Sequence, residues 1–543
     1  MHLKIRYPSR ILPLENRFFS MVLSITLHSN GLIGMPKITL SQEQEAILAS
    51  DAKYICCQAY AGSGKTFILT QLAKRNPDKR ILYLAYNKGI QTEASQKFPS
   101  NTKVITTHAM AYRYLKNLKF KMKFNFNGFD VARLLNITSV QLQFLIIETL
   151  NNYYRSADYS LQIHHVPTEN TGNGKKHAEN VKKRALENAK LIFELQADPK
   201  SDFPAPPDFY IKYFQLVAPP LHTWFDIILF DEAQDANLVT KALLDKCECK
   251  RIFVGDTHQM INRWRGANDA LDASVRDGAQ ILRLTTSYRF GRCVAAIANA
   301  ILMLKGETVS LKTTGITDRL ISKAEVKSIF PRTVISRTNL SVLINAIDAG
   351  RCGKKVFFVG GIDRYALDDI ADFYYLYIGN TKMIKRKAFL YDYPNWDRVV
   401  SVAENSGDNT LKRTIHLIEN EPDILELVDK IKEAAVNNYN DADLTLVTAH
   451  SSKGLEWEYI EIDDDYVSLV EYIEKTPKQK QNLIFINDEL NLLYVAVTRA
   501  TKALSVSMVI MEIISLIKYR KDKKRTIPIV TPDELHLFLT RTK

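Results

Sequence analysis

Residues 54–72 read YICCQAYAGSGKTFILTQL, and this stretch decides the fold that the rest of the chain must accommodate. A short β-prone run at 54–58 leads into a loop with two glycines, and an apolar run at helical spacing begins at Phe67. Strand, glycine loop and helix in this order are the context of a phosphate-binding loop, or P-loop. The stretch therefore predicts an α/β domain that binds a nucleoside triphosphate.

The chemistry of the predicted P-loop follows from its residue types. Gly62 and Gly64 let backbone N–H groups approach phosphate oxygens at the start of the helix. Lys65 adds a positive charge, and the Thr66 hydroxyl is a ligand for Mg²⁺. Position 59 is alanine where the strict pattern has glycine, but a chance glycine turn would not have both flanking elements in register. The expected phosphate-binding residues are Ala59, Tyr60, Ala61, Gly62, Ser63, Gly64, Lys65 and Thr66.

Residues 225–232 read FDIILFDE and form a second element of the same predicted site. A buried strand that ends in acids places a carboxylate beside the metal of a P-loop. We expect Asp231 to hold Mg²⁺ and Glu232 to orient the attacking water. A lone Asp-Glu pair would more often be a solvated strand end, but downstream of a P-loop the pair indicates nucleoside triphosphate hydrolysis.

Further β-prone runs alternate with apolar stretches at helical spacing, which favours parallel α/β layers. Two intervals break this rhythm: a polar, lysine-rich one and a later helical one rich in aromatic and basic residues. The strands are expected at 54–58, 80–85, 225–230, 251–254, 332–336, 355–359, 444–448 and 503–509. The expected domains are an N-terminal extension (1–35), a first α/β domain (36–115 and 205–275) with an insertion (116–204), and a second α/β domain (276–360 and 441–543) with an insertion (361–440).

The composition limits the class of protein. The chain has 543 residues, 46% of them hydrophobic and 24% charged, which excludes a disordered tail and a membrane transporter. A net charge of +13 favours a polyanionic partner such as nucleic acid. The 6 cysteines form no CxxC pair, which indicates a reducing compartment. Residues 18–27 resemble the apolar part of a signal peptide but lack a clear cleavage site.

Several motifs in order along the chain resemble those of the UvrD/Rep helicases of superfamily 1. DEAQD at 231–235 and VGDTHQMINRWRGA at 254–267 resemble motifs II and III. The other matches are TLSQEQ at 39–44 (Q motif), TTHA at 106–109 (motif Ib), LTTSYRFG at 284–291 (motif IV), TAHSSKGLEW at 448–457 (motif V) and LYVAVTRA at 493–500 (motif VI). The resemblance spans residues 39 to about 510, and such an ordered set is far more specific than a P-loop alone.

Within that superfamily the motifs are most similar to the F-box DNA helicase branch. Only 38 residues precede the Q motif, so we expect no F-box domain and no recruitment of a ubiquitin ligase. The interval between motifs IV and V is also short for the large 2B subdomain of UvrD.

The resemblance implies two RecA-like domains with ATP bound between them. The resemblance implies that Gln44 binds the adenine edge, that Tyr288 stacks on the base, and that Glu456 contacts the nucleotide on its sugar side. Arg289 and Arg499 match the arginine fingers, which stabilise charge on the transferred phosphoryl group. Gln259 would sense the γ-phosphate.

The resemblance also implies residues that grip a single DNA strand, by stacking on bases and by polar contacts to phosphates. Trp264 is the leading candidate for stacking, with an ordinary core aromatic as the alternative. Position 262 is Asn where relatives often have a second aromatic residue. The basic runs at 175–184 and 518–525 either widen the DNA contact or are solvated. The other candidate DNA-binding residues are Tyr86, Thr107, His108, Arg265, Thr448 and His450.

The leading hypothesis is an ATP-dependent DNA helicase or single-strand translocase that uses ATP and Mg²⁺. A 3′–5′ polarity and a role in DNA repair or recombination are implied only by the resemblance. The expected partners are single-stranded and duplex DNA and repair or recombination proteins, with no membrane, and the chain is expected to work as a monomer. It would act in the nucleus of a eukaryote or at the nucleoid in the cytoplasm of a prokaryote. The alternatives are an ATP-gated regulator that displaces proteins from DNA without efficient unwinding, and a subunit whose specificity comes from a partner.

Overall fold

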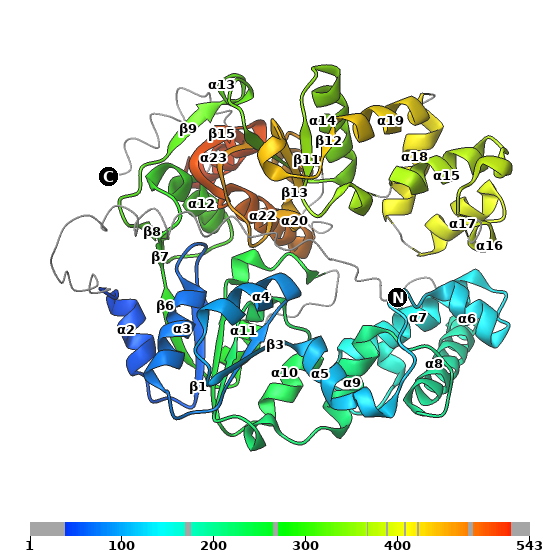
Figure 1. Cartoon of the computed structure of the whole chain (residues 1–543), viewed down its shortest axis with the longest axis horizontal. Coiled ribbons are helices and arrows are strands. Elements are labelled where there is room, and N and C mark those ends of the chain that lie inside the picture. The colour runs from blue at the N-terminus through cyan, green and yellow to red at the C-terminus, as the bar shows by residue number, and fades with distance from the viewer. Residues whose placement is uncertain are drawn as a thin grey trace, which may run out of the picture.

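The computed structural model describes residues 39–168, 175–263, 270–365, 367–386, 389–406, 409–420, 423–475 and 482–522. Two sheets of parallel strands lie in separate halves of the molecule (Figure 1). The first is six-stranded in the order β3-β2-β4-β5-β1-β6, and the second is seven-stranded in the order β12-β11-β13-β10-β14-β15-β9. The predicted fold class, two α/β domains with parallel sheets, is confirmed.

The first sheet is covered by helices on both faces, which explains why its strands read as continuous apolar runs. Alternate residues point to opposite faces: Cys57 packs with α2, α3 and α4, whereas Cys56 packs with α5, α7, α9, α10 and α11. The strands are β1 (Tyr54–Ala59), β2 (Ile81–Ala85), β3 (Thr102–Thr106), β4 (Ile227–Phe230), β5 (Lys250–Gly255) and β6 (Gln280–Leu284). The helices are α2 (Gln42–Ala49), α3 (Lys65–Arg75), α4 (Lys88–Lys97), α5 (Thr107–Leu115), α9 (Pro207–Val217), α10 (Leu238–Asp245) and α11 (Ala270–Arg276).

The second sheet has the same construction. Its two buried faces pack against α12, α22 and α23 on one side and against α14 and α19 on the other. The strands are β9 (Arg319–Ser322), β10 (Arg332–Ser336), β11 (Val356–Phe358), β12 (Ala435–Val436), β13 (Leu444–Thr448), β14 (Trp457–Ile462) and β15 (Ala500–Val506), and β7 (Thr286–Ser287) pairs separately with β8 (Lys312–Thr313). The helices are α12 (Arg292–Leu304), α13 (Lys323–Lys327), α14 (Asn339–Arg351), α20 (Ala449–Ser452), α21 (Leu469–Lys475), α22 (Leu483–Val497) and α23 (Met508–Asp522).

Two groups of helices interrupt the sheets and lie on the same side of the molecule (Figure 1). They meet where the Phe129 and Tyr393 rings pack edge to face at 5.6 Å and Arg133 lies 3.8 Å from Asp392. The first group is α6 (Gly128–Leu135), α7 (Val140–Arg155) and α8 (Lys175–Ala197). The second is α15 (Leu367–Tyr377), α16 (Phe389–Asp392), α17 (Trp396–Ser406), α18 (Asn409–Asn420) and α19 (Ile424–Ala434).

The predicted domain bounds differ from the strand pairing at two places. Strand β6 pairs with β1 in the first sheet, although residues 276–360 are predicted to belong to the second domain. Strand β12 pairs with β11 in the second sheet, although residues 361–440 are assigned to an insertion. Both strands lie at sheet edges, where polar residues are tolerated and the apolar signal is weak. The strand expected at 503–509 occupies Ala500–Val506, and the next helix begins at Met508.

In the described part of the chain, no single helix is long and apolar enough to cross a membrane. Helices α6 and α7 meet that criterion only when taken together, and they are bent by 111° relative to each other.

Candidate nucleotide site

The P-loop connects β1 to α3 through two glycines with left-handed backbone, Gly62 at φ 73° and Gly64 at φ 81°. A Cβ at position 62 would lie 2.5 Å from the Ser287 hydroxyl and 2.7 Å from the Arg289 Cβ, so a side chain cannot fit. The backbone N–H of Tyr288 donates to the Gly62 carbonyl at 2.8 Å. The loop predicted to cradle phosphate therefore lies against the segment predicted to supply the base-stacking residue and an arginine finger.

The two acids after β4 lie beside the P-loop. Lys65 Nζ is 2.8 Å from Glu232 Oε1, and the Thr66 hydroxyl lies 3.4 Å from Asp231 Oδ2. The buried Tyr83 hydroxyl donates to the same Asp231 oxygen at 2.6 Å. A hydroxyl and a carboxylate so close together are the hard oxygen ligands that Mg²⁺ takes from proteins alongside phosphates and water. The residues thus fit the predicted metal pair.

The pKa values of the two acids of this site shift in opposite directions. Burial raises the pKa of Asp231, and the neighbouring Glu232 adds to the effect. Burial also opposes ionisation of Glu232, but Lys65 and Lys453 outweigh it and hold the pKa of this carboxyl well below its usual range. Glu232 is therefore a carboxylate at neutral pH, as a residue that orients water must be.

Lys453 reaches this site from the other half of the molecule, directly after α20. Its ammonium lies 3.3 Å from Glu232 Oε2, bonds to Asp235 and donates to the Gln259 carbonyl at 2.9 Å. The two carboxylates outweigh burial and raise the pKa of Lys453. No role is predicted for this lysine from the sequence, although its place in motif V is a signal that could have indicated one. Lys453 therefore links the acidic motif of the first half to motif V of the second half.

A chain of amide and carboxylate groups joins Glu232 to Gln259. Gln234 Nε2 donates to Glu232 Oε2 at 2.5 Å, and the Asp256 N–H donates to Gln234 Oε1 at 3.0 Å. Gln259 Nε2 then donates to Asp256 Oδ2 at 2.8 Å. All three are buried. Gln259, expected to sense the γ-phosphate, is thus connected to the water-orienting acid through this network.

The two predicted arginine fingers lie near each other, opposite the P-loop. Arg289 Nε donates to Glu456 Oε2 at 2.7 Å and its Nη1 donates to the Thr498 carbonyl at 3.3 Å. Arg499 is 1% exposed. Its described side-chain hydrogen bonds go to oxygens without a full charge, the Val495 and Leu455 carbonyls and the Thr498 hydroxyl, at 2.9, 3.3 and 3.0 Å. Burial, followed by Arg289, lowers the pKa of Arg499 to about 9.

Gln44 lies at the start of α2 against the P-loop. Its Oε1 accepts from the Ser41 N–H at 3.0 Å, and its Nε2 is 3.7 Å from the position of a Cβ at Gly64. Tyr288 is 45% exposed and available for stacking. Glu456 pairs with Arg289, so its expected contact to the sugar stays a prediction.

The predicted DNA-binding residues of the described chain lie at equivalent places in the two halves. Strands β3 and β13 end in Thr106 and Thr448, which cap α5 and α20 with the same backbone angles, φ −82° and ψ 155°. His108 and His450 each follow two residues later. By these angles the residue equivalent to Thr448 is Thr106, the neighbour of the predicted Thr107, and all three side chains are buried. Tyr86 follows β2 and is half-buried, whereas Trp264 and Arg265 lie outside the described residues.

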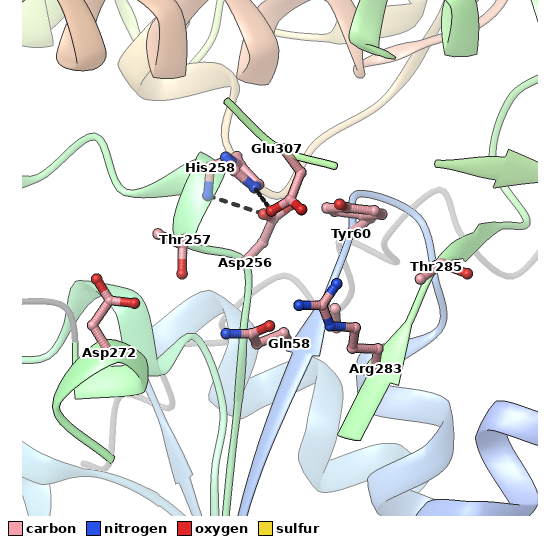
Figure 2. Close-up of a pocket in the computed structure, with 10 residues that line it drawn as sticks. Gln58, Tyr60, Asp256, Thr257, His258, Asp272, Arg283, Thr285 and Glu307 are labelled. Carbon is pink, nitrogen blue, oxygen red and sulfur yellow. Dashed lines mark hydrogen bonds and ion pairs between the residues drawn. The ribbon is translucent and has the colours of Figure 1, made fainter. Parts of the chain in front are cut away.

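A small cavity of about 120 Å³ lies beside the P-loop, next to β6. Figure 2 shows His258 and Glu307 side by side above Asp256, with Gln58 and Arg283 facing them from the neighbouring strands. His258 Nε2 lies 3.5 Å from Glu307 Oε2. Sites for drug-sized ligands usually enclose about 300 Å³ or more. This cavity is thus too small for a nucleoside triphosphate.

Replacing Lys453 by methionine is expected to lower the free energy of unfolding by about 3–5 kcal/mol, because it leaves the buried Asp235 without its cation. Lys502→Met removes the Glu458 pair, whose side chains are 54% and 52% exposed, and should cost about 1 kcal/mol or less. Urea unfolding of both variants measures the difference. Equal losses would mean that Lys453 is not part of a buried ion pair.

Comparison with known proteins identifies related families. Residues 40–272 match the UvrD/REP helicase N-terminal domain, and residues 394–510 match the UvrD-like helicase C-terminal domain. F-box DNA helicase protein 1 of Schizosaccharomyces pombe is 28% identical over 525 residues, covering 88% of this chain and 58% of the relative. F-box DNA helicase 1 of Gallus gallus is 30% identical over 514 residues, covering 89% of this chain and 50% of the relative.

A more distant relative is a probable DNA helicase II homolog of Mycoplasma pneumoniae, 25% identical over 308 residues, which cover 48% of this chain and 42% of the relative. The chain spans about half the length of the F-box helicases it matches.

Proposed function

This chain belongs to the UvrD/Rep-type helicases of superfamily 1, and we propose that it is an ATP-dependent DNA helicase that moves along a single strand. One observation carries the proposal furthest. Lys65 and Glu232 of the first half converge with Lys453 of the second half at one site. Because the groups come from two domains, ATP binding and hydrolysis change how the domains sit together. That coupling is what a translocase needs.

The residues divide the work of hydrolysis as follows. Lys65 and the P-loop N–H groups bind the phosphates, and Thr66 and Asp231 would hold Mg²⁺, which would supply positive charge to the phosphate oxygens. Glu232 orients the attacking water. To do so, its carboxylate exchanges its contacts with Lys65 and Lys453 for a contact with that water. Arg499 and Arg289 compensate the charge that develops on the transferred group.

DNA contact is proposed at the carboxyl ends of β3 and β13. Thr106 and Thr448 accept from the N–H groups of Ala109 and Ser451 at 3.2 and 3.3 Å, so each caps a helix, and the N-terminus of the nine-residue α5 attracts a phosphate. His108 lies 3.1 Å from Asp208 and is half exposed. One such grip on each half supports stepwise movement when the domains close and open.

The 3′–5′ polarity, the repair or recombination role and action as a monomer are proposed from the family. Nuclear action is proposed because the yeast and chicken relatives are eukaryotic.

The test is ATP hydrolysis with and without single-stranded DNA, with a matched RNA strand and the Glu232→Gln protein as controls. We expect strong stimulation by DNA and a loss of at least about 100-fold in the variant, because the glutamine amide cannot act as a base. Nucleotide binding should be retained. Hydrolysis that DNA does not stimulate would contradict the translocase.

The second candidate is an ATP-gated regulator that displaces proteins from DNA. The interval between the motif IV and motif V segments favours it, because its helices α15–α19 form a small insertion. Strand displacement on naked duplex distinguishes the two: a helicase separates the strands, whereas the regulator hydrolyses ATP and leaves them paired.

A further inference from the structure

A loop in the first group of helices brings together three metal-binding side chains, far in sequence from the nucleotide site. The loop follows α7 and precedes α8, and it carries Asp158, His164 and His165. One ligand atom from each lies within 4.8 Å of the other two. Nothing in the helicase motifs accounts for this cluster.

The three side chains share one carboxylate oxygen. His164 Nε2 lies 2.6 Å from Asp158 Oδ2, and His165 Nε2 lies 3.1 Å from the same atom. The two imidazole rings are 4.1 Å apart between centroids and tilted by 35°. His165 Nε2 also lies 3.2 Å from the Ser156 hydroxyl. All three ligand atoms lie within 4.8 Å of one another, close enough for small side-chain rotations to bring them around one zinc ion.

The surroundings hold the ligands in place. His165 is 3% exposed, and its Nδ1 lies 3.1 Å from the Gln162 carbonyl and 3.0 Å from the Gln162 N–H. Without metal, Nδ1 accepts from that N–H, and Nε2–H is donated to the Ser156 hydroxyl at 3.2 Å, beside Asp158. With metal on Nε2, the proton moves to Nδ1 and is donated to the carbonyl, the usual outer contact of a metal-binding histidine.

The buried Lys212 side chain holds this part of the chain in place through hydrogen bonds. Its ammonium donates to the Ser156 and Asp158 carbonyls at 3.0 and 2.6 Å and to Gln215 Oε1 at 3.1 Å. The backbone on which Asp158 stands is thus anchored before any metal arrives. The charge of Lys212 opposes a dication nearby, so we expect moderate affinity.

We propose that Asp158, His164 and His165 form a binding site for a divalent transition metal such as Zn²⁺. Two imidazoles and one carboxylate are a typical ligand set for zinc, and water completes the coordination because His164 and Asp158 are partly exposed, 59% and 40%. The metal fastens residues 158–165 after α7, and it takes no part in ATP hydrolysis.

The test uses the untagged full-length chain, stripped with a chelator and held in excess Mg²⁺ to occupy the nucleotide site. Zn²⁺ is titrated by calorimetry, and Co²⁺ is added to a second sample for its visible absorption. We expect one Zn²⁺ per chain and a Co²⁺ spectrum without a thiolate band, since no cysteine takes part. Asp158→Asn and His164→Gln should each weaken binding by about 10-fold or more, whereas His416→Gln, an exposed histidine on α18, should not.

Absence of saturable binding by the wild-type chain would overturn the proposal, as would variants that bind like the wild type. If Asp158→Asn fails to fold, His164→Gln still tests the site because its side chain is largely exposed. Calorimetry reads metal binding directly, so the result does not depend on whether the chain unwinds DNA.

Discussion

Replacing Lys65 by alanine is expected to reduce ATP hydrolysis by about 100-fold to 1,000-fold, with or without DNA. The lysine supplies the positive charge that meets the β- and γ-phosphates, and no other cation of the first half lies as close to Glu232, 2.8 Å away, among the residues described. Steady-state hydrolysis and the affinity for a fluorescent ATP analogue would measure the loss.

Lys74→Ala is the matched control for that experiment. Lys74 lies in the last turn of the same helix, α3, and is exposed, so its removal should change neither hydrolysis nor nucleotide affinity. The Lys65 variant should stay folded because Glu232 keeps Lys453 at 3.3 Å. A Lys65→Ala protein that hydrolyses ATP at the wild-type rate would show that residues 59–66 are not the phosphate site.

Replacing Arg499 by alanine is expected to lower kcat for ATP by about 10³-fold to 10⁵-fold, the range for loss of an arginine finger. The structure supplies the physical reason. A buried guanidinium whose hydrogen bonds go to uncharged oxygens is costly, and an incoming anion would relieve that cost. The γ-phosphate is such an anion, and its charge grows in the transition state.

Nucleotide affinity separates this role from a purely structural one. Because the P-loop still binds the phosphates, Arg499→Ala should retain ATP affinity within about 10-fold. This corresponds to about 1.4 kcal/mol of binding free energy. Arg292→Ala, at the exposed start of α12, is the control and should hydrolyse ATP normally. Weak ATP binding with normal turnover by Arg499→Ala would contradict the finger role.

Local sequence predicted the parts of this site whose chemistry is local. The strand, glycine loop and helix at 54–72 need only neighbouring residues to form, and the acids at 231–232 follow directly from a buried strand. For the same reason the expected strands at 332–336 and 444–448 have the predicted bounds. Both are central strands, buried on both faces, and such strands read as apolar runs.

Edge strands and contacts between the halves could not be predicted in this way. Strand β6 reads Gln-Ile-Leu-Arg-Leu without a regular alternation, and Leu284 is its one buried residue, so its membership of the first sheet depends on pairing with β1. The equivalence of Thr106 with Thr448 became visible only from matching backbone angles at the ends of two strands.

By itself, the sequence predicted two α/β domains, a P-loop with its acids and the ordered helicase motifs, because each motif and each central strand is written in consecutive residues. Only the tertiary structure decided that Lys453 joins Glu232 across the two halves, that Arg499 is buried among uncharged acceptors, and that Asp158 meets His164 and His165. The physical reason is distance. The partners of a charge are chosen by what packs within about 4 Å of it, and chain order does not encode that spacing.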